Sequence, residues 1–468
     1  MVKKKTTENK FILYINPFIF LFFMKKTLYF AAALVSALAS CSSDDDMQNN
    51  QAFVDNSNNG MVPVELGLSN GSVNVFQTRG TGTVGDTALA TNVFQNEDLY
   101  VLMTTIPDSK SGLQWTFTSI GDEGDAKEPQ FDGSFISRPE KSEDKWVINY
   151  TDFTGHKVKY YPIDGEIRSD FFAFYIDDAA TNLTAGNPVI SDSVGRDVKY
   201  VEFKIDGSQD IMTGKAEKND GDYTTFPYRG YSARSARKGI KPEIPMQHML
   251  TRFTFGLLPR QKEALGLIID TLYIYSRSEG VLTVAYNQDG TKVPNELVRW
   301  TQDPTTPMDS FALKVIPAPY TPSSRIDAAG NKVKLVIPET LAEITKDQIY
   351  AKDPTSGSYD ETTTVFSELF IGDALFVQPN QKEYIIKLVY RYPYESGTGI
   401  AYHRLPATHV VAMKDGTPFE VGKSYHVQIY LYGLNEIGLN VSLTPWGIGN
   451  DGKPIPVNAD PSEQSLGN

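Results

Sequence analysis

Residues 425–443 read YHVQIYLYGLNEIGLNVSL, and the pattern of this stretch decides the fold. Apolar side chains occupy every second position from Tyr425 to Leu431 and again from Ile437 to Leu443. Because successive side chains of a β-strand point to opposite faces of a sheet, this alternation predicts two half-buried strands. The glycines at positions 433 and 438 predict a turn between the two strands.

The same alternation recurs at short spacing along the chain. It is found in residues 201–205, 253–257, 333–337 and 384–390, and no window of fifteen residues shows a helical stripe. The 25 Phe, 25 Tyr, 36 Gly and 27 Pro also favour many short strands joined by turns. Together these features predict an all-β fold built from β-sandwiches.

Chain length and a polar break predict two sandwich domains. The residues that follow Arg79 are numerous enough for two sandwiches, and the segment 259–263 is a polar break between two apolar strands. We therefore predict a boundary near residue 260. The N-terminal sandwich would span residues 80–260 and the C-terminal sandwich residues 261–468.

The charge and the single cysteine exclude several functions. The formal net charge is −13 in 468 residues, and an acidic surface repels the phosphate backbone of nucleic acids. Cys41 is the only cysteine, so the chain can form neither an intrachain disulfide nor a thiolate metal site. Nucleic acid is therefore not expected among the partners.

The amino terminus has the three parts of a secretory signal. Met24 is followed by two lysines, then by the apolar residues 28–37, and then by small residues directly before Cys41. We interpret residues 1–40 as a signal peptide whose translation starts at Met24. The alternative is a longer signal anchor that includes the apolar residues 11–23.

A strand pattern and a basic loop follow the signal. Residues 42–60 are polar and predict a flexible linker. Alternating apolar residues then predict strand, turn and strand, and these residues are Val62, Val64, Leu66, Leu68, Val73 and Val75. Arg79 is the first basic residue after Cys41, and it lies in the small-residue stretch 78–82. Exposed loops of this kind are where proteases cut.

The sequence contains no catalytic constellation. Residues 67–71 match the letters of a nucleophile elbow, but a strand follows them where the elbow requires a helix. Residues 80–85 match a dinucleotide fingerprint without the buried strand and helix that it requires. The five histidines are scattered singly, with no carboxylate at ligand spacing. We expect no catalytic residue, no metal site and no cofactor, and hence no enzyme.

Several segments together resemble the fimbrillin family of type V pilins and their accessory subunits. The matching segments are residues 159–165, 170–175, 210–216, 246–255 and 445–446, and they follow a lipobox-like Cys41. Taken without the resemblance, Tyr160, Tyr161, Phe172 and Phe174 are aromatic strand residues that pack a sandwich. His248 is then a core or interface histidine and not a metal ligand.

The resemblance implies a fold and a mechanism. The fold is two transthyretin-like Greek-key β-sandwiches in tandem. Cys41 would carry the lipid, and the acidic residues 44–46 resemble a signal for export to the outer face of the outer membrane. A protease would cut between Arg79 and Gly80 and release the pro-segment 41–79, whose strand spans residues 62–75. A strand from another pilin subunit would replace it, and the fibre would serve adhesion to a host or bacterial surface.

Two questions stay open at the level of sequence. The tail after Trp446 has few apolar residues and three prolines, so it is a poor donor strand. Either residues 437–443 act as the donor, or the subunit only accepts a strand and lies at a tip or in an accessory position. The rival function is a monomeric glycan-binding surface lipoprotein, although the chain has only four Trp for stacking on sugars.

Overall fold

Contacts divide the chain into two units, residues 1–60 and residues 61–468, and the described residues lie in the second unit. The computed structural model describes residues 62–70, 99–106, 116–117, 134–142, 145–149, 160–161, 168–177, 190–192, 198–216, 231–286, 296–319, 333–397, 399–432 and 437–444. Nearly all regular structure in these residues is β-strand, which confirms the predicted all-β fold. The helices are the short α2 (Ala233–Arg237), η3 (Lys262–Ala264) and α3 (Lys346–Ile349).

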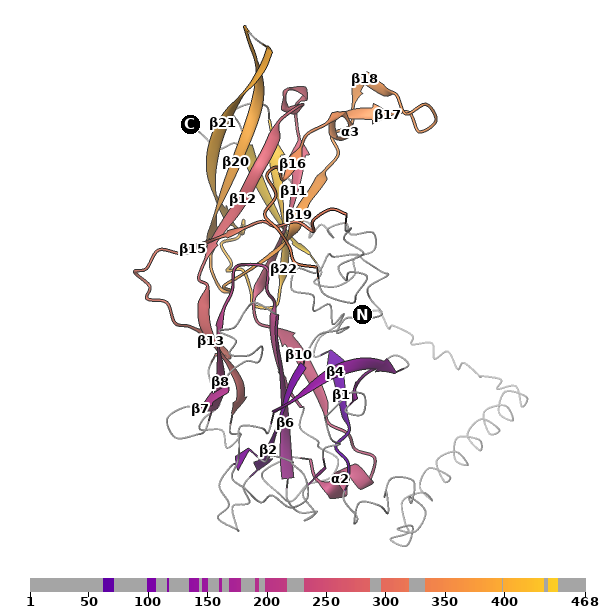
Figure 1. Cartoon of the computed structure of the whole chain (residues 1–468), viewed down its shortest axis with the longest axis vertical. Coiled ribbons are helices and arrows are strands. Elements are labelled where there is room, and N and C mark those ends of the chain that lie inside the picture. The colour runs from indigo at the N-terminus through magenta and orange to yellow at the C-terminus, as the bar shows by residue number, and fades with distance from the viewer. Residues whose placement is uncertain are drawn as a thin grey trace, which may run out of the picture. The chain divides into compact units, whose positions relative to one another are not determined.

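An eight-stranded sheet contains the first strands of the chain (Figure 1). Its order is β3-β2-β4-β5-β1-β10-β9-β6, and β2 also pairs with β6, so the sheet closes on itself apart from β3. The strands are β1 (Leu66–Asn70), β2 (Leu99–Ile106), β3 (Thr116–Phe117), β4 (Ser134–Ser142), β5 (Lys145–Asn149), β6 (Arg168–Ile176), β9 (Ile211–Lys215) and β10 (Glu243–His248).

Two further sheets have four strands each, and both join strands from distant parts of the chain. The first has the order β14-β13-β8-β7, with β14 (Val298–Trp300), β13 (Glu279–Tyr286), β8 (Val198–Lys204) and β7 (Ile190–Asp192). The second has the order β19-β11-β22-β23, with β19 (Leu369–Val377), β11 (Thr251–Pro259), β22 (Ser424–Leu431) and β23 (Ile437–Thr444). β22 and β23 pair antiparallel, as two strands joined across residues 432–436.

A five-stranded sheet contains the two longest strands. Its path is β15-β12-β20-β21, and β16 also pairs with β12. The strands are β12 (Ile268–Ser276), β15 (Asp309–Ala312), β16 (Ala342–Glu343), β20 (Glu383–Ser396) and β21 (Gly399–Ala412). Phe253 of β11 contacts Tyr384 of β20 with ring centroids 5.1 Å apart. This ring contact is part of a large buried apolar cluster to which strands of several sheets contribute.

The strand predicted over residues 333–337 is wrong. This segment forms only an isolated bridge, between Val336 and Val315. Of the alternating residues, Val333 and Leu335 are half-buried and Ile337 is 54% exposed, so none of the three is fully buried. Pro338 follows directly, and proline cannot donate to a ladder. The other strands predicted by alternation, in residues 201–205, 253–257, 384–390 and 425–443, coincide with β8, β11, β20, β22 and β23.

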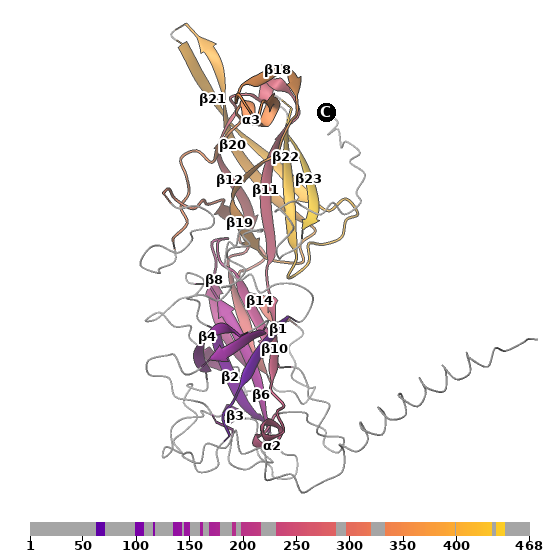
Figure 2. The same cartoon turned by 90° about the vertical axis from the view of Figure 1, so that its right-hand side faces the viewer.

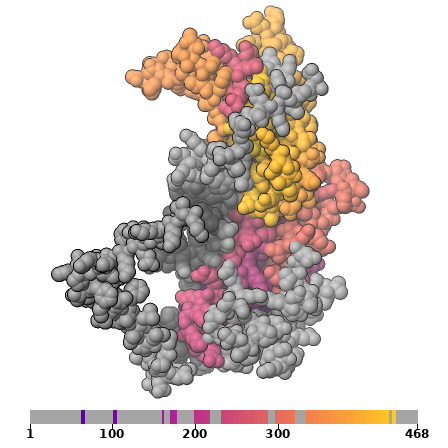
Figure 3. All heavy atoms as spheres, turned by 180° about the vertical axis from the view of Figure 1, so that it is seen from behind, coloured from indigo at the N-terminus to yellow at the C-terminus, as the bar shows by residue number. Residues whose placement is uncertain are grey.

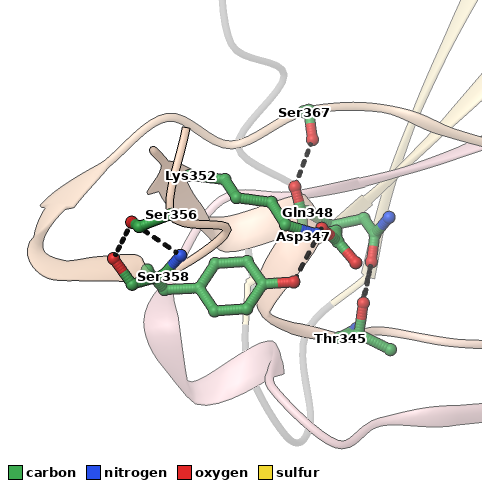
Figure 4. A network of polar contacts seen from close by, with 8 residues as sticks. Thr345, Asp347, Gln348, Lys352, Ser356, Ser358 and Ser367 are labelled. Carbon is green, nitrogen blue, oxygen red and sulfur yellow. Dashed lines mark hydrogen bonds and ion pairs between the residues drawn. The ribbon is translucent and has the colours of Figure 1, made fainter. Parts of the chain in front are cut away.

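A small polar excursion is formed by α3 with β17 (Tyr350–Lys352) and β18 (Tyr359–Thr364) (Figure 4). Asp347 accepts hydrogen bonds from the Tyr359 hydroxyl at 2.7 Å and from Lys352 Nζ at 3.0 Å. These two hydrogen bonds lower the pKa of the Asp347 carboxyl, and the bond from the Tyr359 hydroxyl has the larger effect. The Thr345 hydroxyl donates to Gln348 at 2.8 Å and closes the first turn of α3. These contacts are exposed, so each contributes little to the free energy of unfolding, although together they fix the local conformation.

Candidate functional site

Strand β1 occupies an interior position of the eight-stranded sheet (Figure 2). It pairs parallel with β10, from Gly67 opposite Glu243 to Asn70 opposite Met246. On its other edge it pairs antiparallel with β5, with Leu66 opposite Ile148. Both backbone edges of β1 are therefore used, although the strand comes from the beginning of the described chain.

The residues directly before β1 are also tied to the sheet. Pro63 forms a bridge with Tyr160, and the Tyr161 amide donates to the Val62 carbonyl at 2.9 Å. Glu65 forms an ion pair with Lys241, which follows α2. The segment from residue 62 to residue 70 is thus held along its whole length.

The side chains of this segment alternate as predicted. Val62, Val64 and Leu66 are only 5%, 1% and 1% exposed, whereas Pro63 and Glu65 between them are partly exposed. Burying a Val or Leu side chain contributes roughly 2 kcal/mol, so these three anchor the segment firmly. Of the other residues predicted in this strand, Leu68 lies in β1 with its side chain outside the description, and Val73 and Val75 lie outside the described residues.

A buried apolar cluster surrounds the three anchors. Phe171 lies at its centre and makes edge-on ring contacts with Tyr161 and Tyr231, with centroids 5.9 and 6.0 Å apart. Besides Val62, Val64 and Leu66, the cluster contains Val101, Met103, Tyr161, Phe171, Ala173, Tyr175, Met212, Ala216, Tyr231, Ala233, Ile244 and Met246. It is separate from the large cluster that contains Phe253. Removing the segment 62–70 would therefore take three members from a local core.

Three of the segments that carry the family resemblance lie side by side here. β6, β9 and β10 contain most of residues 170–175, 210–216 and the start of 246–255, and β9 pairs with both neighbours. Gly214 lies between Ala173 and Met246. A Cβ at position 214 would come within 2.5 Å of the Pro245 carbonyl oxygen, so the close strand approach requires glycine.

An ion pair joins two of these segments. His248 Nδ1 lies 2.7 Å from Asp210 Oδ2, and Asp210 is fully buried. The Ile211 amide donates to Asp210 Oδ1 at 2.8 Å. Burial raises the pKa of the Asp210 carboxyl, and the nearby His248 opposes this rise. The His248 side chain is 11% exposed, so it is partly buried at this contact. No group of side chains that could hold a metal ion occurs among the described residues.

A second histidine, His426, also has polar partners on neighbouring strands. Its Nε2 lies 2.7 Å from Glu368 Oε1, and its Nδ1 lies 2.9 Å from the Thr254 hydroxyl. The order hydroxyl, imidazole, carboxylate is that of an activated nucleophile. The His426 side chain is only 1% exposed, and the carboxylate of Glu368 covers Gly256 on the neighbouring strand. We therefore assign this set to the cohesion of β11, β22 and the start of β19.

A charged group that the sequence did not predict lies on the five-stranded sheet. Arg391 and Arg404 stand directly opposite each other on β20 and β21, and both contact Asp270 of β12. The two arginines are distant from Asp270 in sequence, so alternation alone cannot bring the three together. The turn glycines at 397 and 399 are the signal that could have set the register of the hairpin.

Removing the hydroxyl of Tyr161 should stabilise the protein. The Tyr161 side chain is 2% exposed, and no described residue accepts or donates a hydrogen bond at its hydroxyl. An unsatisfied buried hydroxyl costs roughly 1 to 3 kcal/mol, so Tyr161→Phe should raise the free energy of unfolding by about 1 kcal/mol in urea titrations. Tyr384→Phe is the matched control, because this hydroxyl donates to the Gln378 carbonyl and its loss should be destabilising. A destabilised Tyr161→Phe would mean that the hydroxyl has a partner.

The residues predicted for lipidation and cleavage lie outside the described residues. These are Cys41, Arg79 and Gly80. None of the helices among the described residues combines the length and the apolar character needed to cross a bilayer.

Comparison with known proteins finds solved structures only at low sequence identity and low TM-score. No family model and no curated protein matches the chain. Among solved structures, a proposed cell adhesion protein from Bacteroides uniformis is 11% identical and matches 83% of this chain and 99% of its own, with a TM-score of 0.36. A proposed adhesin from Bacteroides thetaiotaomicron is 7% identical over 81% of this chain and 95% of its own, with a TM-score of 0.31. The fimbrial anchor protein Mfa2 from Porphyromonas gingivalis is 10% identical over 81% and 98%, with a TM-score of 0.25. Similarities at this level do not assign the chain to a family, and the class that the strands define is that of all-β proteins.

Proposed function

We propose that this chain is a structural subunit of an adhesive surface fibre, exported as a lipoprotein, matured by cleavage after Arg79 and assembled by strand exchange. The proposal includes no enzymatic activity. The observation that supports it best is the position of β1. A strand that precedes the candidate cleavage loop lies in the interior of a sheet and contributes Val62, Val64 and Leu66 to a local core.

The consequence of losing this segment follows from its contacts. Without β1, the facing edges of β5 and β10 would have unpaired backbone N–H and C=O groups. The apolar side chains around Phe171 and Ile244 would lose their cover at the same time. An unpaired sheet edge beside apolar side chains is an acceptor for a strand from another molecule.

The donor strand has two candidate origins, and they lead to different positions in a fibre. β23 is an edge strand that pairs only with β22 along the path of its sheet, so it could leave by breaking a single ladder. A subunit that donates β23 and accepts a strand beside β10 could repeat along a stalk. A subunit that only accepts would cap the fibre or serve as an accessory subunit.

The proposed route to the surface uses the undescribed amino terminus. In this scheme Cys41 carries the lipid, the polar residues 42–60 tether the folded unit to the outer membrane, and cleavage at Arg79 separates the two. The partners are then other subunits of the fibre and the surface to which it adheres. The tandem sandwich domains, 80–260 and 261–468, belong to the same proposal.

Limited trypsin treatment of the chain from Ser42 onward tests the proposal. We expect an early product that begins at Gly80 and then forms larger species in size-exclusion chromatography. Arg79→Gln should abolish both, and Arg299→Gln, which changes an exposed arginine on β14, should change neither. If the product beginning at Gly80 stays monomeric, β1 is not a removable strand, and the tethered glycan-binding lipoprotein becomes the better hypothesis.

A further inference from the structure

The hairpin of β20 and β21 extends beyond the sheet to which it belongs (Figure 1). Pairing of β12 with β20 ends at Ile268 opposite Arg391, whereas β20 and β21 continue to pair as far as Ser396 and Gly399. We call residues 392–403 the hairpin tip. In the space-filling view from behind, the light-orange end of this hairpin projects at the top (Figure 3).

Two arginines stand at the base of the hairpin tip. Arg391 and Arg404 are direct cross-strand partners, and like charges in this position repel each other. Asp270 lies between them at an irregularity of β12 and holds both. Its Oδ1 accepts from Arg391 Nε at 2.7 Å and its Oδ2 from Arg404 Nε at 3.0 Å. The Asp270 side chain is 6% exposed, so the arginines are held by a buried carboxylate.

The group formed by Asp270, Arg391 and Arg404 has one positive charge that the carboxylate does not balance. Asp270 balances one of the two guanidinium groups, and each arginine uses only its Nε for this contact. Arg391 Nη2 also donates to the Thr340 hydroxyl at 3.1 Å. Among the described residues, Arg404 has no other acceptor, and its side chain is 64% exposed. The nearby carboxylate of Glu343, on β16 opposite Ile268 of β12, forms no ion pair with either arginine in the described part of the chain.

An exposed aromatic side chain lies beside this charge. Tyr402 precedes Arg404 by two residues in β21, so both lie on one face of the strand, about 7 Å apart along it. The Arg391 guanidinium carbon is 5.7 Å from the centre of the Tyr402 ring. Tyr402 is 47% exposed, and Ile400, two residues further toward the tip, is 71% exposed.

The opposite face of the hairpin tip is stiffened by stacked rings. The His403 ring stacks on Tyr394 with centroids 4.0 Å apart and an interplanar angle of 22°. It also contacts Tyr392 at 5.2 Å. A two-stranded extension without sheet neighbours is marginal by itself, and these contacts hold its shape. A binding site whose shape is already set loses less entropy on binding.

We propose that this face of the hairpin binds a carboxylated sugar. The carboxylate contacts the terminal nitrogens of Arg404, and the pyranose ring packs on Tyr402. A guanidinium fork matches a carboxylate, and the exposed ring of Tyr402, about 7 Å away along the strand, offers a flat apolar face for the sugar ring. An acidic peptide fits less well, because stable peptide or protein partners need far more surface than these few exposed side chains offer. The site is distant in sequence from β1 and does not depend on strand exchange.

Ligand binding by the uncut chain from Ser42 onward tests this site. Saturation-transfer NMR would measure 3′-sialyllactose and digalacturonic acid, with lactose as the uncharged control. We expect both acids to bind at low salt and to weaken at high salt, and lactose to bind about tenfold more weakly. Arg404→Gln and Tyr402→Ala should each weaken the acids about tenfold, because each removes one of the two contacts.

The controls separate this proposal from its rivals and from a loss of folding. Arg299→Gln, an exposed arginine on another sheet, should leave binding unchanged, and the thermal midpoint of each variant should stay well above the temperature of the binding measurement. The assignment is overturned if lactose binds as tightly as the acids, if neither acid binds, or if Arg404→Gln has no effect. It is also overturned if a hexaglutamate peptide displaces the sugars at equal concentration, which would assign the site to acidic peptides. Arg404→Gln should leave self-association after cleavage intact.

Discussion

A synthetic peptide of residues 61–71 is expected to block self-association of the protein cut after Arg79. The peptide carries the three anchors Val62, Val64 and Leu66, and its backbone can restore the pairing with β5 and β10. A vacant position filled by peptide cannot accept a strand from another subunit. In size-exclusion chromatography the cut protein should then elute as a monomer, and its thermal midpoint should return to that of the uncut chain.

Changes within the peptide show which contacts matter. Leu66→Asp would bring an unpaired carboxylate to a position that is 1% exposed, which costs about 3 kcal/mol or more. The altered peptide should bind roughly a hundredfold more weakly and leave self-association intact. Glu65→Gln is the matched control, because the Glu65 side chain is 39% exposed and forms its ion pair with the exposed Lys241. Larger species that form equally with every peptide would show that the position of β1 is not the acceptor.

Local alternation predicted six of the 23 described strands, namely β1, β8, β11, β20, β22 and β23. It placed strands at residues 62–68, 201–205, 253–257, 384–390 and 425–443. In these segments apolar and polar residues alternate, and this alternation is typical of a strand with one buried face. It failed at residues 333–337, where the alternating side chains are not fully buried and Pro338 follows an isolated bridge. A pattern of apolar residues shows that a face could be buried, but the neighbour that buries it lies elsewhere in the chain.

Pairing between distant strands could not be predicted. β1 lies between β5 and β10, and β10 begins at Glu243, far along the chain. Register between such strands depends on packing of their side chains, as with Gly214 and the Pro245 carbonyl, and no local signal specifies it. The cluster of Asp270, Arg391 and Arg404 was missed for the same reason, although each residue is ordinary in its own segment.

The pairing of β6, β9 and β10 shows what the segments that carry the family resemblance have in common. In sequence they are separate motifs, which are compatible both with core residues and with a family signature. The sheet brings residues 170–175, 210–216 and 246–248 onto adjacent strands beside β1. Their shared task in the structure is to form the surroundings of the segment that strand exchange would replace. Whether that segment leaves is the question that the cleavage and peptide experiments answer.

His248→Ala is expected to lower the free energy of unfolding by about 3 kcal/mol. The substitution leaves the Asp210 carboxylate fully buried, with the Ile211 amide as its remaining hydrogen-bond donor among the described residues. Removing one partner of a buried pair typically costs 3 to 5 kcal/mol. Gln247→Ala changes the exposed neighbour on β10 and should cost less than about 0.5 kcal/mol. Urea unfolding at pH 7 measures all three proteins.

The pH dependence separates loss of the ion pair from loss of packing. Burial raises the pKa of Asp210, and without His248 this rise is opposed less, because the Ile211 amide remains but the imidazole is lost. Between the ordinary carboxyl pKa and the raised one, the folded variant binds a proton that the unfolded chain releases, so its stability falls as pH rises. The difference between His248→Ala and the unchanged protein should therefore narrow as the pH is lowered from 7 toward 4. A difference that stays constant over this range would assign the loss to packing of the imidazole ring, and Asp210 would then need no charge partner to lie at the junction of β9 and β10.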